Sequence, residues 1–171
     1  MKVFRNIGMC IAIAGGITAF ILCMIFGQTQ FARYLYIGFL SMIIYFAAGG
    51  NKDWKLCARM VCTFAIGLLW GQLSNLVYVA IFPINALAAS VVDYFVIVCA
   101  LLFVHLVLLR NTIFNFVPTA FLGLALTIGF YGRPFPYAGQ GLAGDMSPLQ
   151  ITVYLFVYVL FGLLFSIMIN Y

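Results

Sequence analysis

Apolar residues fill almost the whole chain, in six long stretches that are separated by short polar breaks. Each stretch approaches or exceeds the ~20 residues that an α-helix needs to cross the hydrocarbon core of a bilayer. None shows the strict alternation of a transmembrane β-strand. The pattern predicts an all-α integral membrane protein with six transmembrane helices, at roughly 5–27, 31–49, 57–82, 85–108, 112–131 and 148–170.

Parts of these stretches repeat. Residues 39–50 read FLSMIIYFAAGG, and 82 positions later residues 121–132 read FLGLALTIGFYG. The segment IGLLWG at 66–71 matches FGLLFS at 161–166 if the second copy carries one insertion. Three helices in each copy give an odd number of crossings, so the copies would have opposite orientations in the membrane. We therefore predict one transmembrane domain over 1–171 made of two inverted three-helix repeats, about 1–83 and about 84–171.

Composition supports a membrane protein. Of the 171 residues, 67% are hydrophobic and 6% are charged, whereas about 25% are charged in a soluble domain. The predicted loops leave no room for a soluble domain that would hold a cofactor. The first stretch follows Lys2 and Arg5, as in a signal peptide, but no A-x-A-like cleavage site follows it, so we expect it to be a helix of the mature protein.

Basic residues in the predicted loops are divided unevenly between the two sides of the membrane. One side carries six of them, and the other carries Arg33 and Arg133. The six are Lys2, Arg5, Lys52, Lys55, Arg59 and Arg110. By the positive-inside rule they mark the cytoplasm, so both termini are expected there. Topology thus accounts for the net charge of +5, and no nucleic-acid partner is needed to explain it.

Asp93 is the sole acidic residue within the apolar stretches, about eight residues into the fourth. Ionisable residues inside a membrane are expensive and are functional by default. Gln72 and Asn75 share a face of the third helix, and Asn75 is at about the depth of Asp93. A short turn at 83–84 would bring the third and fourth helices together. We expect these amides to hydrogen-bond the Asp93 carboxyl, with Ser90 one turn outward on the Asp93 face.

Two interpretations of this cluster stay open. Asp93 either holds two helices in register, or binds a proton or a cationic group during transport while Gln72 and Asn75 orient the solute. His105 lies twelve residues further along, about 18 Å away and about 120° around the helix, so the two do not pair directly. For His105 we favour a snorkelling or capping role over a proton relay.

Pro118 lies about two turns into the fifth stretch. A proline removes one helical hydrogen bond and clashes with the preceding turn, so the sequence predicts a kink or break at Pro118 and Thr119. Carbonyls freed by a break are tolerated in a membrane only where protein or a water-lined cavity satisfies them. The break is therefore either structural or part of a solute pathway.

Small residues recur every four positions in three stretches, which lets helix backbones approach closely. The stripes are Gly8, Ala12 and Gly16; Gly67 and Gly71; and Thr119, Gly123 and Thr127. They indicate tight packing within the chain or between copies, so a homo-oligomer in the lipid bilayer is expected. A narrow solute path lined by small residues is the alternative interpretation.

The longest loop, 133–146, is predicted on the outer side of the membrane. Its proline and glycine content argues against regular structure. It is either a surface loop or a segment that covers or re-enters a vestibule. Ser147 and Pro148 are typical of the cap and first position of the last helix.

Motifs for catalysis and metal binding are not found in the sequence. The five cysteines, at 10, 23, 57, 62 and 99, lack metal-ligand spacing and are expected to be small buried apolar residues. Three acidic residues and one histidine offer little acid–base chemistry. No helical His-Glu metal motif, phosphate-binding glycine loop or Ser/His/Asp set is present. We expect no enzymatic activity, no cofactor and no metal.

Three segments are similar to a known family. Residues 45–50 (YFAAGG), 67–70 (GLLW) and 116–123 (FVPTAFLG) resemble conserved pieces of the bacterial inner-membrane family catalogued as domain of unknown function 1097. That family usually has glycine where Thr119 stands, and its last loop is often shorter. The resemblance implies a multi-span protein of a prokaryotic inner (plasma) membrane and brings no established substrate or catalytic residue.

Three functions follow as hypotheses. The leading one is a channel or facilitative transporter for a small polar solute, because charges that would hold an ion are nearly absent. A urea- or amide-like molecule, or a short carboxylic acid in neutral form, suits such a lining. The alternatives are a proton- or ion-coupled carrier that uses Asp93, and a non-transporting membrane subunit or scaffold for a partner protein.

Overall fold

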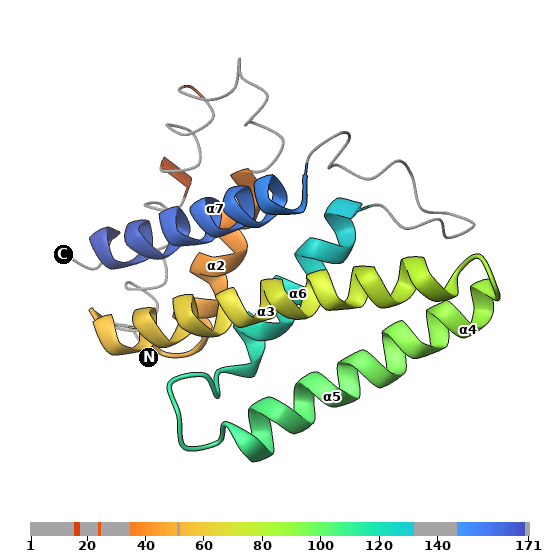
Figure 1. Cartoon of the computed structure of the whole chain (residues 1–171). Helices are drawn as coiled ribbons and strands as arrows, with labels where there is room; N and C mark the ends of the chain where they lie inside the picture. The colour runs from red at the N-terminus through yellow and green to blue at the C-terminus, as the bar shows by residue number, and fades with distance from the viewer. Residues whose placement is uncertain (1–15, 18–23, 25–34, 51, 132–146, 170–171) are drawn as a thin grey trace. The chain divides into compact units, whose positions relative to one another are not determined.

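The structure is a computed structural model that describes residues 16–17, 24, 35–50, 52–131 and 147–169. Every regular element in these ranges is helical (Figure 1). Within the described ranges, three helices are long and apolar enough to cross a membrane: Trp54–Ile81, Ala86–Leu108 and Pro148–Met168. Two shorter apolar helices, Ile37–Ala47 and Val117–Tyr131, accompany them. The described chain is therefore an all-helical protein of membrane-spanning character.

These five helices coincide with the second to sixth predicted stretches. The first stretch, 5–27, and the loop 133–146 lie outside the described residues, apart from 16–17 and 24 in the former. The chain divides into two compact units, which are described separately. One comprises Met1–Trp54 and Tyr158–Tyr171, and the other comprises Lys55–Val157. Helix α7 (Pro148–Ile169) contributes to both.

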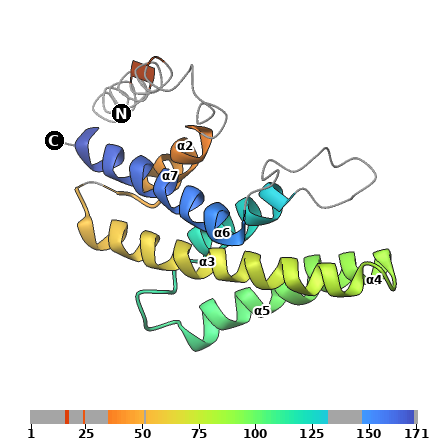
Figure 2. The same cartoon turned by 45° about the horizontal axis from the view of Figure 1, so that its top comes forward.

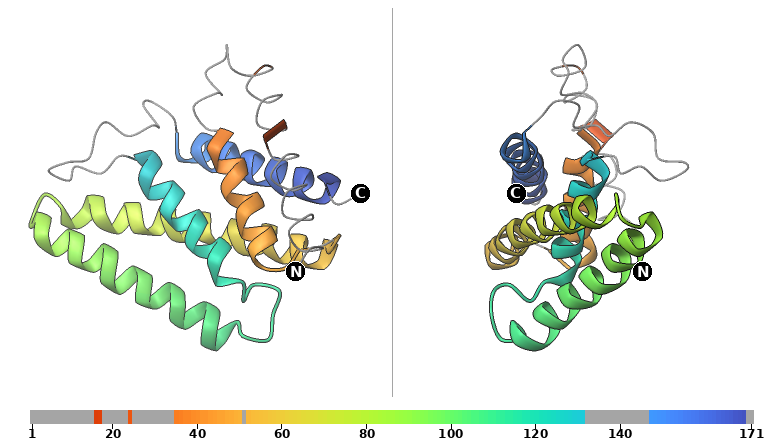
Figure 3. Two further views of the ribbon diagram at one scale, coloured as in Figure 1. Left: turned by 180° about the vertical axis from the view of Figure 1, so that it is seen from behind. Right: turned by 45° about the vertical axis from the view of Figure 1, so that its right-hand side comes forward.

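A helical hairpin forms the framework of the second unit. Helix α3 (Trp54–Ile81) lies alongside a second long helix that runs back from Ala86, as the three ribbon views show (Figures 1, 2 and 3). The turn between them is closed by the amide of Asn85, which donates to the carbonyl of Ile81 at 3.0 Å. The Asn85 side chain then caps the new helix by accepting from the amide of Ala88 at 2.9 Å. The predicted short turn at 83–84 is confirmed.

The returning helix is not α-helical throughout. It is built of α4 (Ala86–Val91), the π-helical segment η2 (Val92–Ile97), α5 (Val98–Phe103) and the π-helical segment η3 (Val104–Leu108). A π turn contains one residue more than an α turn. Successive side chains are therefore separated by a smaller angle around the helix axis.

Every fourth residue of this helix is buried. The buried residues are Ala89, Asp93, Ile97, Leu101 and His105. In an ideal α-helix each step of four residues advances by about 40° beyond a full turn. The two π-helical segments offset this drift, so the five side chains follow one seam. The angle of 120° between Asp93 and His105 expected from the sequence is therefore too large.

Helix α6 (Val117–Tyr131) starts later than the predicted span at 112. Pro118 is therefore its second residue. The amides of the first helical turn make no intrahelical hydrogen bond, so a proline at this position breaks none. The hydroxyl of buried Thr119 accordingly donates to the carbonyl of Phe116, at 3.1 Å, at the start of the helix. The predicted break at Pro118 and Thr119 is wrong, because the residues before Val117 form the connection from η3 instead of a first helical turn.

Helices α3 and α6 touch at glycines. A β-carbon at Gly67 would overlap the carbonyl of Ala120, and one at Gly123 would lie 2.7 Å from the backbone of Gly67. A contact this close requires glycine on both helices, as the small-residue stripes predict. Beside it, Ala120 and Leu124 of α6 form a buried apolar cluster with two residues of the returning helix, Ile97 and Leu101.

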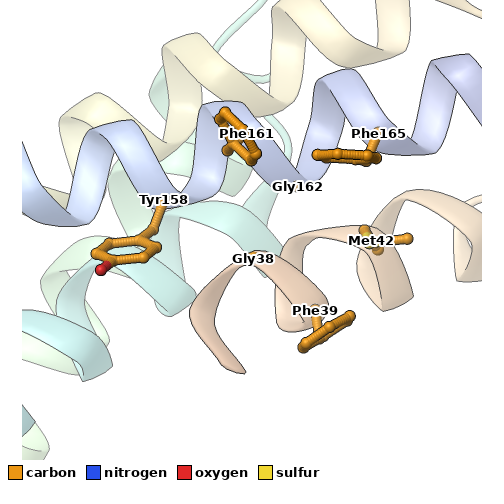
Figure 4. Close-up of a pocket in the computed structure, with 7 residues that line it drawn as sticks. All are labelled: Gly38, Phe39, Met42, Tyr158, Phe161, Gly162 and Phe165. Carbon is orange, nitrogen blue, oxygen red and sulfur yellow. The ribbon is translucent and has the colours of Figure 1, made fainter. Parts of the chain in front are cut away.

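In the first unit, α2 (Leu35–Ala47) packs against the second half of α7. A β-carbon at Gly162 would overlap the carbonyl of Gly38, and the hydroxyl of Ser41 donates to the carbonyl of Val159 at 3.2 Å. Figure 4 shows the hollow beside this contact, where Phe39 of α2 and Phe161 of α7 project around the two glycines. The hollow is apolar and its seven lining residues come from these two helices.

The end of α2 is fixed by a glycine. Gly49 has a φ of 79°, a conformation that other residues adopt only at a cost. It lets the amide of Gly50 donate back to the carbonyl of Tyr45 at 3.0 Å, which is the Schellman arrangement of a helix end. The glycine pair of the segment YFAAGG thus ends the helix.

A prediction concerns the start of α7. The hydroxyl of Ser147 accepts from the amide of Gln150 at 3.3 Å, and the Gln150 side chain accepts from the amide of Ser147 at 2.8 Å. Ser147→Ala should lower the free energy of unfolding by about 1 kcal/mol, the usual contribution of a cap. Unfolding of the purified protein in detergent micelles measures this. Ser147→Asp keeps a capping oxygen and should stay near wild type, and an equal loss in both variants would contradict the capping role.

Candidate functional site

Asp93 lies in the apolar hairpin of α3 and the returning helix, with 1% of its surface exposed. It is seven residues from the start of its helix, which places it about 10 Å along the axis from Ala86. The hydroxyl of Ser74, from α3, donates to one oxygen of the Asp93 carboxyl. Ser74 is itself fully buried. The turn at the end of α3 therefore does what the sequence predicts and brings the third and fourth helices together at Asp93.

The backbone around Asp93 is unusual. Asp93 is the second residue of the π-helical segment η2. π-Helical turns inside α-helices are rare and occur often at functional sites. His105, the second residue of η3, occupies the matching position in the other π-helical segment. The two ionisable residues at the core of this helix thus both lie where its winding departs from the α form.

The polar residues predicted to lie at Asp93 do not hydrogen-bond its carboxyl. Gln72 makes its hydrogen bonds on a different side of α3, toward α6 and α7. Asn75 is half-buried and makes no hydrogen bond within the described residues. Ser90 donates its hydroxyl to the carbonyl of Ala86 at 3.0 Å, within its own helix. The prediction that Gln72 and Asn75 pair with Asp93 is wrong, because the residue of α3 that bonds the Asp93 carboxyl is Ser74, next to Asn75.

The spacing of small residues in α3 identifies Ser74 as a residue of its buried face. Gly67, Gly71, Ser74 and Tyr78 follow one another at spacings of four, three and four residues, and all four are buried. A stripe with that spacing lies on one face of an α-helix. Gln72 and Asn75 each lie one residue away from it, so extending the glycine stripe selects Ser74 as the residue that faces the neighbouring helices.

Gln72 links three helices. Its side-chain oxygen accepts from the hydroxyl of Tyr131 at 2.6 Å, and its nitrogen donates to the hydroxyl of Thr152 at 3.0 Å. The same nitrogen lies 3.3 Å from the carbonyl of Pro148. Both the oxygen and the nitrogen of the amide are therefore bonded to the ends of α6 and α7, an arrangement that serves packing.

Gln72→Leu should consequently lower the stability of the fold by about 1 kcal/mol, the scale of an interhelical hydrogen bond in a membrane. The expected measurement is a lower unfolding midpoint in micelles or bicelles. Tyr131→Phe removes one partner of the same amide and should cost less. A Gln72→Leu protein as stable as wild type would contradict the linking role.

The opposite end of the hairpin holds a second polar group of residues. Nδ1 of His105 lies 2.5 Å from the carbonyl oxygen of Phe114, and the hydroxyl of Thr63 donates to the carbonyl of Ile113 at 3.2 Å. The guanidinium of Arg59 donates to the side-chain oxygen of Asn115. Three side chains thus hold the connection 109–116 before it enters α6. Of the two roles predicted for His105, snorkelling to the surface is wrong, because the side chain is fully buried.

The chemistry available at Asp93 is that of a carboxyl held by a hydroxyl partner in an apolar setting. Such a group can take up and release a proton, or hold a cationic group. In the described ranges no three His, Cys, Asp or Glu side chains gather closely enough to hold a metal ion. Of the described cysteines, Cys57 is buried as expected, whereas Cys62 is half-buried and Cys99 is exposed.

Comparison with known proteins identifies one family. A family model described as "Protein of unknown function (DUF1097)" matches residues 9–170. No curated protein and no protein of known structure shows significant similarity to the chain.

Proposed function

The chain belongs to the DUF1097 family, and we propose that it moves a small polar solute across a prokaryotic inner membrane through two inverted three-helix repeats. The observation that carries the proposal is the buried pair of Asp93 and Ser74 in a π-helical turn of a membrane-spanning helix. An ionisable group at such a position is costly to maintain, and proton relays and solute pathways are where membrane proteins keep one.

The repeat architecture is supported by two helix contacts that correspond residue by residue. In the second unit, Gly67 of α3 meets the carbonyl of Ala120 of α6. In the first unit, Gly162 of α7 meets the carbonyl of Gly38 of α2. Ala120 lies 82 positions after Gly38, and Gly162 lies 95 after Gly67, which are the offsets of the two sequence matches. The repeated segments therefore make the same contact within each unit.

Their neighbours correspond as well. The serine hydroxyl of Ser41 reaches the carbonyl of Val159, and a β-carbon at Gly123 would lie 2.8 Å from the carbonyl of Phe64. Gly123 is 82 positions after Ser41, and Val159 is 95 after Phe64. A chance likeness between apolar stretches gives no reason for the same four positions to meet twice.

Burial follows the same offset. The described buried residues of α2 are Ile37, Ser41, Met42 and Tyr45, and their counterparts 82 positions later, Thr119, Gly123, Leu124 and Thr127, are all buried in α6. In the first unit, α2, the second helix of the first copy, packs on α7, the third helix of the second copy. In the second unit, α6, the second helix of the second copy, packs on α3, the third helix of the first copy. Exchange of helices between inverted copies is compatible with the transporter architecture in which the solute site lies between the repeats.

Of the two modes of transport, the coupled carrier has the specific support. A passive pore needs no titrating group, whereas Asp93 is enclosed and hydrogen-bonded to Ser74. We therefore place proton coupling at Asp93, with Ser74 as its positioning partner. The solute class stays that of a small amide or a short carboxylic acid in neutral form. Both termini face the cytoplasm in this proposal, and the chain forms homo-oligomers.

Flux into proteoliposomes tests the proposal. The protein is reconstituted and presented with a panel of small amides, polyols, amines and short carboxylates, with and without an imposed pH gradient. Selective flux that follows the gradient is the expected result. Selective flux that ignores the gradient would favour the facilitative mode. No flux from correctly folded protein would overturn transport and point to a scaffold, which would purify with a partner.

A further inference from the structure

His105 is the second ionisable group in the seam of buried residues, and no role in solute binding requires it. It has no exposed surface. Its ring is held on one side by the carbonyl of Phe114. On the other side, Nε2 is buried and has no hydrogen-bond partner in the described part of the chain. A buried polar atom left in this way has lost its hydrogen bonds to water without replacement, and calls for a reason.

The contact with Phe114 fixes which nitrogen carries the proton. A carbonyl oxygen only accepts, so Nδ1 must donate and therefore holds the hydrogen in the neutral ring. Nε2 is then an acceptor with a free lone pair. The ring is oriented, its tautomer is set, and its basic nitrogen is the atom turned away from the Phe114 carbonyl.

The groups around His105 bear on whether it can gain a charge. From α3 comes Arg59, which is hydrogen-bonded to Asn115, the residue after Phe114. The connection after η3 adds Arg110, whose carbonyl accepts from Asn115 at 2.5 Å. Helix α6 has no ionisable residue before Tyr131. Among the described side chains that hydrogen-bond this connection, Arg59 is the one charged group.

We propose that His105 is a second proton-binding site of the chain, which accepts a proton at Nε2 while Nδ1 stays bonded to the Phe114 carbonyl. The proton comes from water and the imidazole becomes an imidazolium. His105 and Asp93 lie about 18 Å apart along the axis on one buried seam, toward the two ends of the helix. This inference rests on the proposed transport for its biological use, and His105 would serve as the proton group nearest the cytoplasm.

The chain contains one histidine, so His105 can be observed directly. Protein labelled with ¹⁵N in histidine is placed in lipid nanodiscs, and the two ring nitrogen signals are followed by solid-state NMR between about pH 8 and pH 5, the range in which histidine charge changes are expected. The expected spectrum at high pH is that of the Nδ1–H tautomer. It should change reversibly to that of the imidazolium. An Nε2–H tautomer at high pH, or a ring that stays neutral while the protein stays folded, would overturn the proposal.

Variants separate proton binding from anchoring of the connection. Thr63→Val removes a hydroxyl that holds Ile113 of the same connection but removes no base. His105→Gln keeps an amide that can donate to the Phe114 carbonyl but cannot be protonated. The pH-gradient response of flux should be lost in His105→Gln and retained in Thr63→Val. Equal loss in both would assign His105 to anchoring and overturn the proposal.

The two readouts fail independently. If His105 titrates as expected but no solute moves, the proton site stands and the proposed transport falls. If flux follows the pH gradient while His105 stays neutral, transport stands and the second proton site falls.

Discussion

Asp93→Asn should make solute flux independent of a pH gradient. Asparagine has nearly the shape of aspartic acid and can still accept the hydroxyl of Ser74 through its side-chain oxygen, so the hairpin should fold. It cannot exchange a proton. Gradient-driven uptake should therefore fall by about 100-fold, the low end of what a positioned acid–base group contributes. The measurement is uptake into proteoliposomes with and without the gradient, and exchange of solute at equal pH should persist.

Asp53 provides the matched control. It has the same side chain, lies immediately before α3 and is exposed. Its amide donates to the hydroxyl of Tyr45 at 3.1 Å, a contact that a change of side chain leaves in place. Asp53→Asn should thus keep the full gradient response. A gradient response that survives in Asp93→Asn would remove Asp93 from the coupling mechanism and leave it a structural role.

Gly67→Ala is expected to be the most destabilising single methyl substitution in the second unit. The new β-carbon would overlap the Ala120 carbonyl, and backbone cannot move aside as the tip of a side chain can. Overpacking of this kind costs about 3 kcal/mol. Chemical unfolding in mixed micelles should show the loss, together with weaker protection of α6 amides against hydrogen exchange.

Gly129→Ala is the control for Gly67→Ala. Gly129 lies in α6, and no atom of the described residues outside its own turn comes within 4 Å of the place that an added methyl group would take. Alanine there should leave stability unchanged or raise it slightly, because alanine favours a helix over glycine. If the two variants were equally stable, the close contact of α3 and α6 would not form in the protein.

The same experiment examines the repeat. Gly162→Ala would place its methyl against the carbonyl of Gly38, as Gly67→Ala does with Ala120. Two inverted copies therefore predict losses of similar size for the two variants. A large loss in one variant and none in the other would show that the correspondence does not extend to energetics.

Spans could be predicted from the sequence because membrane helices are defined by length and hydropathy. The stretch 57–82 differs by one to three residues at its ends from α3, and 85–108 differs by one from Ala86–Leu108. The cap at Ser147 was also predictable, since capping depends on residues that are adjacent in the chain. Both features depend only on residues that are close together in the sequence.

The partner of Asp93 depended on the rotation of α3, which apolar composition does not reveal. Polar residues in a membrane helix attract attention by type, and Gln72 and Asn75 are more polar than Ser74. The glycines at 67 and 71 carry the rotational information, because they identify the face that meets α6. Polarity alone therefore selected residues next to the correct one.

The break predicted at Pro118 was wrong and the π-helical segments were not predicted, for different reasons. Proline has opposite consequences at the second residue of a helix and at its seventh, so a five-residue error in the start of α6 reversed the prediction. The π turns at Val92–Ile97 and Val104–Leu108 have no distinguishing residues. They show only in the spacing of buried positions, which becomes visible once the neighbours are known.

The π-helical segments also give the helix from Ala86 to Leu108 a way to move internally. A π turn is an extra residue held within the helix, and it can migrate when hydrogen bonds exchange between adjacent turns. Residues that the migrating turn passes rotate by about 100°, whereas those beyond it keep their orientation. In the proposed transport, such a migration would turn Asp93 from one neighbour to another while both helix ends stay in place, so access to its carboxyl would change without rigid-body tilting.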